Sequence, residues 1–303
     1  MASKWISNMI VDFKTYEALS DHKIGIVGIP SGEYLELSVE EFNSINDARY
    51  LDYNTRLKAF TFDDKDVNGI TYFIKSSQIY KIRKFLDLLG IKKYKINDDY
   101  TVDTYGDDIK IRKKMENIPI KFGYVDGNFD CSHCGLISLM GCPDEVSGDF
   151  NASNNNLPDL YYSPEIVSGN YDVSHNKIVS LKGAPTKIYG NFIIAYNSIK
   201  KLNYSPAIVD GDFDCSSCML EDLDGAPDDI GGDFNCSFNY LKTLKNGPDM
   251  IKGTYDCSFN EIETLKDGPD VARIFKCNNN KIKDLSLAPI DCDEVISHGQ
   301  KLQ

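Results

Sequence analysis

The chain has 303 residues, of which 42% are hydrophobic, and a formal net charge of −13. This length allows about two domains, and the sequence contains no run of 18 apolar residues that could span a membrane. The negative charge is uneven, because residues 1–114 contain 18 basic and 18 acidic side chains, whereas residues 115–303 contain 15 and 28. The acidic balance of the C-terminal part disfavours direct nucleic-acid binding, which relies on basic side chains that contact phosphates.

Residues 1–105 show short helix and strand patterns but no motif of a known family. Ser38 and Glu41 have the Ser-x-x-Glu spacing of a capping box, which predicts the start of a helix. In chain order we expect a helix at 6–19, a strand at 23–29, a helix from 38 to 48, strands at 58–62 and 70–75, a helix at 78–89 and a strand at 91–96. Together they predict an α+β N-terminal domain, residues 1–105, that caps the apolar end of the segment that follows.

From Gly127 to Pro289 one phrase is repeated eight times, at intervals of 21 residues that shorten to 20 in the last copy. Each copy contains an aromatic residue followed two positions later by a small apolar residue, as in Phe234-Asn-Cys236. The aromatic positions are Phe129, Phe150, Tyr171, Phe192, Phe213, Phe234, Tyr255 and Phe275. The small positions are Cys131, Ala152, Val173, Ile194, Cys215, Cys236, Cys257 and Cys277. The spacing of two predicts a short strand whose two side chains point the same way.

Further rows complete each repeat. An Asn or Cys, such as Asn239, follows the small residue by three positions, and its amide is able to pair backbone groups inside a turn because it both donates and accepts. Two rows of Leu or Ile come next, and a Pro closes the repeat. A period in the twenties is typical of a solenoid, in which stacked repeats bury residues that no single repeat buries alone.

This pattern resembles the leucine-rich repeat, with Phe-x-Cys-x-x-Asn-x-Leu standing for its Leu-x-Leu-x-x-(Asn or Cys)-x-Leu core. The short period and the Pro-bearing return leg are most similar to bacterial and tailed-phage versions. The resemblance covers about residues 106–292, and it implies a parallel β-sheet on a concave face with extended return legs. One departure is that a Val or Ile, such as Val146, lies one position earlier than the first Leu of the family.

The predicted second domain therefore covers residues 106–303. It contains the eight repeats, a degenerate first half-repeat and a short polar C-terminal cap from Asp291 onward. The half-repeat is marked by Ile109, Ile111, Met115 and Ile118, which precede the first full repeat at repeat spacing.

The nine cysteines raise the question of a metal site, because Cys131 and Cys134, and Cys215 and Cys218, have the spacing of zinc knuckles. Both pairs, however, fall on the small apolar row and the Asn row, where Cys packs as a small hydrophobe. Parallel strands stack about 4.8 Å apart, so two pairs separated by four repeats do not meet at one ion. We expect neither a metal nor a cofactor, and this use of Cys suits a reducing cytoplasm. The segment Met1–Asn8 lacks the apolar core of a signal peptide, which predicts the same location.

The exposed positions beside each aromatic residue are the candidate binding surface. They are rich in Asp and Asn, and aromatic side chains follow four positions after several of the aromatic residues. The predicted binding residues are Asp130, Asp149, Asp172, Asp212, Asp214, Asp233, Asp256, His175, Tyr196, Phe238 and Phe259. An acidic groove beside aromatic anchors suits a basic protein partner. The alternative is that these polar rows only solvate the sheet and discourage aggregation, without binding a partner.

These patterns favour non-enzymatic protein binding by the acidic concave surface, without direct contact to nucleic acid or membrane. The resemblance implies a phage or bacterial cytoplasmic factor that binds or inhibits a basic host protein. Two alternatives remain open at this point: an enzyme whose site lies in the N-terminal domain while the repeats select the substrate, and a structural component of a virion. The partner and the oligomeric state are not encoded in any pattern that we can interpret.

Overall fold

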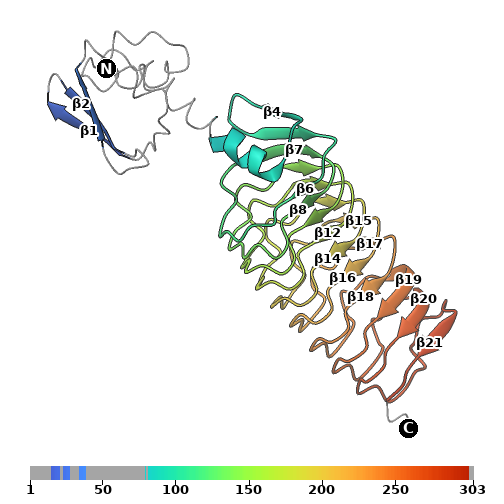
Figure 1. The fold of residues 1–303 in the computed structure, drawn as a ribbon. Helices are drawn as coiled ribbons and strands as arrows, with labels where there is room; N and C mark the ends of the chain where they lie inside the picture. Colours follow the sequence, from blue (N-terminus) through green and yellow to red (C-terminus); the bar gives the residue numbers. More distant parts are fainter. Residues whose placement is uncertain (1–14, 21–22, 28–33, 39–78, 80, 300–303) are drawn as a thin grey trace. The chain divides into compact units, whose positions relative to one another are not determined.

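The computed structural model of the chain describes residues 15–20, 23–27, 34–38, 79 and 81–299 (Figure 1). The chain divides into two compact units, residues 1–85 and 86–303. The expected boundary was at residue 105, and residues 94–105 contribute strands to a sheet of the second unit.

The first unit contains a three-stranded antiparallel sheet of β1 (Thr15–Ser20), β2 (Lys23–Val27) and β3 (Tyr34–Ser38). The expected strand at 23–29 is present as β2. The expected helix at 6–19 is wrong for residues 15–19, because this stretch pairs with β2 and its Thr15 and Tyr16 favour a pleated strand. The helix expected after Ser38 and the strands expected at 58–62 and 70–75 lie outside the described residues.

A helix at residues 81–89 confirms the described part of the helix expected at 78–89. Leu86 on this helix is fully buried. The helix ends at Gly90, whose φ of 75° is accessible to glycine without strain. There the backbone N–H of Gly90 bonds to the carbonyl of Asp87, and the N–H of Ile91 bonds to the carbonyl of Leu86.

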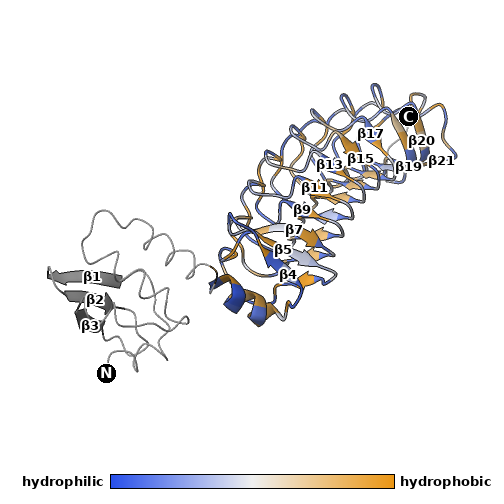
Figure 2. Ribbon diagram, turned by 90° about the horizontal axis from the view of Figure 1, so that it is seen from above, coloured by the Kyte–Doolittle hydropathy of each residue, from blue (hydrophilic) through white to orange (hydrophobic). Residues whose placement is uncertain are grey.

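The second unit is a solenoid of parallel strands that form two sheets, with loops of the return legs along the opposite side (Figures 1 and 2). In spatial order the ten-stranded sheet contains β6 (Ile109–Lys110), β8 (Phe129–Asp130), β10 (Phe150–Asn151), β12 (Tyr171–Asp172), β14 (Phe192–Ile193), β16 (Phe213–Asp214), β18 (Phe234–Asn235), β19 (Met250–Asp256), β20 (Val271–Lys276) and β21 (Glu294–Ile296). The eight-stranded sheet contains β4 (Tyr94–Ile96), β5 (Val102–Tyr105), β7 (Phe122–Asp126), β9 (Glu145–Val146), β11 (Ile166–Val167), β13 (Lys187–Ile188), β15 (Ile208–Val209) and β17 (Asp229–Ile230). Only β4 pairs antiparallel in these two sheets.

The pairing confirms the repeat register. Phe129, Phe150 and Tyr171 are direct partners on neighbouring strands, and the same register continues to Phe275. We number the rungs one to eight by these aromatic residues, from Phe129 in rung one to Phe275 in rung eight. Ile109 pairs with Phe129, so the half-repeat adds one rung before the first full repeat. At the other end, residues expected to form a cap add β21 to the sheet.

The core follows the predicted columns. All eight aromatic residues of the rungs are fully buried, and neighbouring rings lie with centroids 5.0–5.9 Å apart. The small apolar row, including Cys215 and Cys236, is also fully buried, as are most of the Leu and Ile rows. Burial of these columns between consecutive rungs is the main source of stability in a solenoid.

The repeat pattern predicts one strand per repeat, but most repeats contribute two. The early Val or Ile, such as Val146 in β9, lies in a separate strand because one extra residue separates it from the aromatic position. The backbone turns a corner between the two strands at a Gly, and the N–H of Gly232 bonds to the carbonyl of Gly211 on the previous rung at 2.9 Å. The departure from the leucine-rich pattern therefore corresponds to a corner between two sheets.

Two rungs carry Tyr in the aromatic column, and only one of the hydroxyl groups has a partner among the described residues. Tyr171 Oη lies 2.6 Å from Ser163 Oγ, whereas the fully buried Tyr255 Oη has no hydrogen-bond partner there. The position equivalent to Ser163, four repeats later, is Gly247, which offers no hydroxyl. Burial raises the pKa of both tyrosines above the ordinary value, so both stay neutral.

Tyr255→Phe is therefore expected to raise the free energy of unfolding by about 1 kcal/mol, because it removes a buried polar group without a partner. Tyr171→Phe is the matched control and is expected to lower the free energy of unfolding, because it removes a bonded hydroxyl. Urea denaturation of the two variants and the wild type measures both changes. A loss of stability in Tyr255→Phe as large as that in Tyr171→Phe would show that the Tyr255 hydroxyl has a partner.

Candidate functional site

The candidate site is the exposed side of the ten-stranded sheet, where three lines of side chains run across the rungs. The corner row precedes the aromatic residues and consists of Asn128, Asp149, Asn170, Asn191, Asp212, Asp233 and Thr254. The strand row follows them and consists of Asp130, Asn151, Asp172, Ile193, Asp214, Asn235, Asp256 and Lys276. The turn column comes three positions later and consists of His133, Asn154, His175, Tyr196, Ser217, Phe238, Phe259 and Asn279.

The side chains of the corner row bond to the backbone of the next rung, which the repeat pattern does not predict. Oδ1 of each Asp or Asn accepts the backbone N–H of the same position on the next rung, at 2.7 Å for Asp149, Asp212 and Asp233. Asn128, Asn170 and Asn191 make the same bond. One oxygen of each of these carboxylates is thus used inside the solenoid, and the second oxygen is left for the outer surface.

The ladder of the corner row begins at Asp108, which precedes rung one. Its Oδ1 accepts the N–H of Asn128 at 3.1 Å, and this bond lowers the pKa of Asp108 below its ordinary value. The cause is physical, since a hydrogen bond to the charged form favours ionisation. A carboxylate at this end of the row is consequently charged at neutral pH.

The strand row also binds the backbone. Oδ1 of Asp172, Asp214 and Asp256 accepts the N–H of the Ser two residues later, at 2.8–2.9 Å. Asn151 and Asn235 make the equivalent bond, so either side chain supports the turn after the strand. Asp alternates with a neutral residue along this row, which keeps like charges two rungs, or about 9.6 Å, apart.

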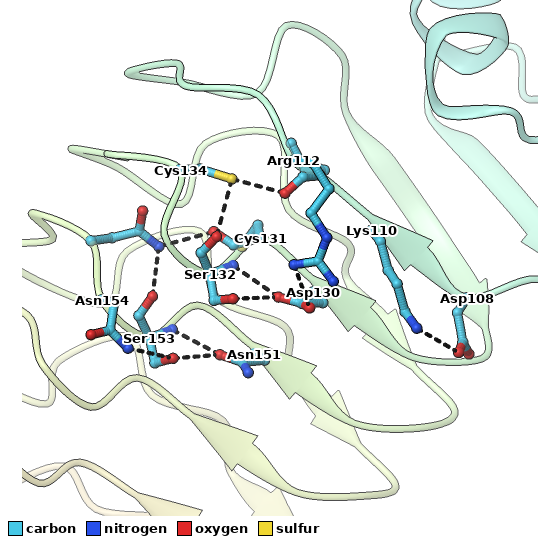
Figure 3. A network of polar contacts seen from close by, with 12 residues as sticks. Asp108, Lys110, Arg112, Asp130, Cys131, Ser132, Cys134, Asn151, Ser153 and Asn154 are labelled. Carbon is cyan, nitrogen blue, oxygen red and sulfur yellow. Dashed lines mark hydrogen bonds and ion pairs between the residues drawn. The ribbon is translucent and has the colours of Figure 1, made fainter.

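Asp130 differs from the other acidic residues of the strand row because it already has a basic partner (Figure 3). Its Oδ1 accepts the N–H and the hydroxyl of Ser132, at 3.0 and 2.7 Å, while Arg112 Nη1 lies 3.2 Å from its Oδ2. The pairing of Ile109 with Phe129 and of Lys110 with Asp130 aligns Arg112 with Ser132, one position before the turn column. A guanidinium can therefore reach the free oxygen of a strand-row Asp from the neighbouring rung.

The remaining predicted carboxylates lack such compensation. On the return legs Lys201 pairs with Asp222 and Asp224, at 3.0 and 2.9 Å, and Lys200 pairs with Glu221 at 2.7 Å. Within the described part of the chain, by contrast, no basic side chain forms an ion pair with six of the predicted site residues. These six are Asp149, Asp172, Asp212, Asp214, Asp233 and Asp256. The strand face thus presents uncompensated negative charge, bounded along the strand row by Lys110 and Lys276.

The turn column brings the predicted aromatic residues together in pairs. His175 and Tyr196 stack with centroids 4.2 Å apart, and so do Phe238 and Phe259. All residues of the column have positive φ, between 51° and 58°, a region that disfavours side chains with a Cβ and suits Asn better than aromatic residues. Tyr196, Phe238 and Phe259 are 54%, 55% and 44% exposed, so these rings are presented to solvent from strained positions.

Seven of the cysteines occupy the predicted small apolar and Asn rows, whereas Cys142 and Cys292 lie outside them. Eight of the nine cysteines are buried, and Cys292 is half-buried. Cys134 and Cys218 take the place of Asn, and their Sγ atoms donate to the carbonyls of Ile111 and Ile194 at 3.1 and 3.3 Å. Burial raises the pKa of the Cys218 thiol to about 12 and that of Cys215 well above the ordinary value, so both stay protonated at neutral pH. Among the residues that the structure describes, no group of three or more potential ligands surrounds a metal position.

A separate shallow groove of about 480 Å³ lies on the return legs and is lined by Ile137, Ser138, Asp159, Tyr161 and Tyr162. Its two polar side chains hold local backbone, since Asp159 Oδ1 accepts the N–H of Tyr161 and Ser138 Oγ accepts the N–H of Met140, each at 3.1 Å. The groove contains none of the predicted site residues. No helix in the described ranges is long and apolar enough to cross a membrane.

Comparisons with known proteins do not assign the chain to a family. No family model, no curated protein and no solved structure matches it. Inferences about function therefore depend on the geometry of the strand face.

Proposed function

We propose that the protein is a non-enzymatic protein-binding module whose strand face receives a basic surface of its partner. In this proposal the rungs are leucine-rich repeats of the short-period bacterial and tailed-phage type, and the partner is a host protein that the chain binds or inhibits in the cytoplasm. The observation that carries the proposal is the set of six carboxylates that no basic side chain of the described chain compensates.

The geometry of the carboxylates supports recognition of a cationic surface. Their Oδ1 atoms are held by backbone N–H groups, so the side chains are fixed in place before a partner arrives. Fixed charges of one sign speed association with an oppositely charged partner and favour it over acidic partners. The exposed rings of the turn column add apolar anchors beside the charges, a combination typical of protein interfaces.

A variant with Asp212, Asp214, Asp233 and Asp256 all replaced by Asn tests this proposal. Asn makes the same backbone bonds at Asn151, Asn170, Asn191 and Asn235, so we expect the variant to fold. Its melting temperature should equal or exceed that of the wild type, because like charges on neighbouring rungs repel by roughly 1 kcal/mol per pair in water.

Affinity capture from the native cell with wild type and with the four-Asn variant, followed by mass spectrometry, is the measurement. Proteins that are retained by the wild type and lost by the variant should be basic. Equal capture of the same proteins by both forms would contradict a role for the carboxylates in binding.

A further inference from the structure

The turn column contains a gap between its two pairs of stacked rings. His175 and Tyr196 occupy rungs three and four, Phe238 and Phe259 occupy rungs six and seven, and Ser217 lies between the pairs on rung five. The backbone is the same throughout, since φ is 57° at Tyr196, 52° at Ser217 and 56° at Phe238. The side chains of Tyr196 and Phe238 thus start from equivalent backbone positions on either side of one rung that carries only a small side chain. We call this gap the Ser217 slot.

The width of the slot suits one flat group. Neighbouring rungs lie about 4.8 Å apart, so the rings on rungs four and six are about 9.6 Å apart. A planar group inserted midway would lie about 4.8 Å from each ring centroid, within the range of about 6 Å over which a cation is attracted to an aromatic face. Within each stacked pair the ring planes deviate from parallel by 9° or less, which shows that this column orients flat groups parallel to one another.

The charge beside the slot selects a cation. Asp214 lies on the same rung as Ser217, its Oδ1 accepts the N–H of Ser216 at 2.9 Å, and no basic side chain of the described residues pairs with it. Rings on two sides together with a carboxylate favour a flat, weakly hydrated cation.

The chain itself contains a precedent for this arrangement. The guanidinium of Arg112 lies 3.2 Å from Oδ2 of Asp130, whose Oδ1 is bonded to the turn in the same way as that of Asp214. A guanidinium can therefore pair with the outer oxygen of a strand-row Asp while the inner oxygen supports the turn. Lysine fits less well, because its ammonium is compact and strongly hydrated and cannot stack as a plane.

We propose that the Ser217 slot binds an arginine side chain of the partner, with the guanidinium stacked between Tyr196 and Phe238 and paired with Asp214. This inference rests on the proposed function, because it specifies which chemical group of the basic partner enters the strand face. It makes rung five the centre of recognition, with the carboxylates of the other rungs supplying attraction that does not distinguish arginine from lysine.

Anisotropy titrations of the full chain with labelled octa-arginine and octa-lysine peptides, at one fixed ionic strength, test the slot. The wild type should bind octa-arginine about tenfold more tightly, since stacking on two rings adds to the charge attraction. Ser217→Phe fills the slot with a ring that this column already accepts at Phe238, and it should remove the preference for arginine while binding of octa-lysine is unchanged. Asn154→Phe adds a ring to the same column outside the slot and should leave the preference intact.

A matched pair of charge variants separates the slot from the general acidic surface. Asp214→Asn and Asp172→Asn each remove one carboxylate from the strand row, and Asn supports the local turn at both places as it does at Asn151. Asp214→Asn should weaken binding of octa-arginine several-fold more than Asp172→Asn does. Thermal melts of all variants verify that they are folded.

The outcomes distinguish the slot from the proposed function. Equal affinity of the wild type for the two peptides, unaffected by Ser217→Phe, would overturn the slot and leave the acidic face as the binding surface. No binding of either peptide would overturn both the proposed function and the slot. Binding of an oligoadenylate that Ser217→Phe abolishes, without binding of octa-arginine, would assign the slot to a nucleobase and overturn the inference.

Discussion

Asn239→Ala is expected to lower the free energy of unfolding by about 1–3 kcal/mol, because it leaves several buried backbone groups without partners. The amide Nδ2 of Asn239 donates to the carbonyls of Cys215, Cys236 and Ser237 at 3.0–3.2 Å, and its Oδ1 accepts the N–H of Leu220 at 3.0 Å. The side chain is 6% exposed, so water replaces these bonds poorly. Chemical denaturation of the variant and the wild type measures the loss.

Asn239→Cys is the matched variant and should be milder than Asn239→Ala. Cys218 already occupies the same row one rung earlier, where its Sγ retains a bond to the carbonyl of Ile194. Unfolding free energies of wild type and Asn239→Ala that agree within experimental error would contradict the role assigned to the Asn row.

Gly232→Ala is expected to destabilise the solenoid by about 1–3 kcal/mol through overpacking at the corner between the sheets. A Cβ at this position would overlap Oδ1 of Asp212, and it would also approach the backbone of Gly211 to 3.0 Å. Asp212 cannot simply move away, because its Oδ1 accepts the N–H of Asp233 at 2.7 Å. Thermal and urea denaturation measure the change.

A double-mutant cycle with Asp212→Ala identifies the cause of that loss. Removing the Asp212 carboxylate provides space for the new methyl group, so the double variant should lose less stability than the sum of the two single variants. Strict additivity would show that Gly232 is required for another reason, such as its contact with the backbone of the previous rung.

The solenoid is largely predictable from the sequence because each rung repeats the same pattern of buried residues and the same turn. Eight copies in register identify the buried aromatic, Leu and Ile columns, and the turn of Asn239 follows from the donor and acceptor capacity of its amide. The second sheet is not predictable in the same way. The second sheet forms because each repeat has one residue more than the leucine-rich pattern between the early Val or Ile and the aromatic residue. The spacing alone does not show that the backbone turns a corner there, as it does at Gly232.

The residues of the candidate site are predictable from the sequence, but the hydrogen bonds that their side chains make to the backbone are not. The sequence placed Asp212, Asp214 and the aromatic residues on one exposed face, and the structure does bring them there. The sequence does not reveal that each Oδ1 accepts a backbone N–H. Asp and Asn are interchangeable in that bond, so their alternation resembles ordinary variation of surface residues. The ion pair of Arg112 with Asp130 was not predicted either, because the half-repeat is too degenerate to show which of its side chains lies beside the strand row.

The most direct test of the central claim is the association rate between the captured partner and the chain, measured by stopped flow over a series of ionic strengths. If the carboxylates of the strand face attract a basic partner, the rate constant of the wild type should fall by about tenfold or more between low and physiological ionic strength. The variant with Asp212, Asp214, Asp233 and Asp256 replaced by Asn should associate more slowly at low salt and show a much flatter dependence. Equal rate constants and equal salt dependence for the two forms would contradict the account and reduce the carboxylates to supports of the backbone.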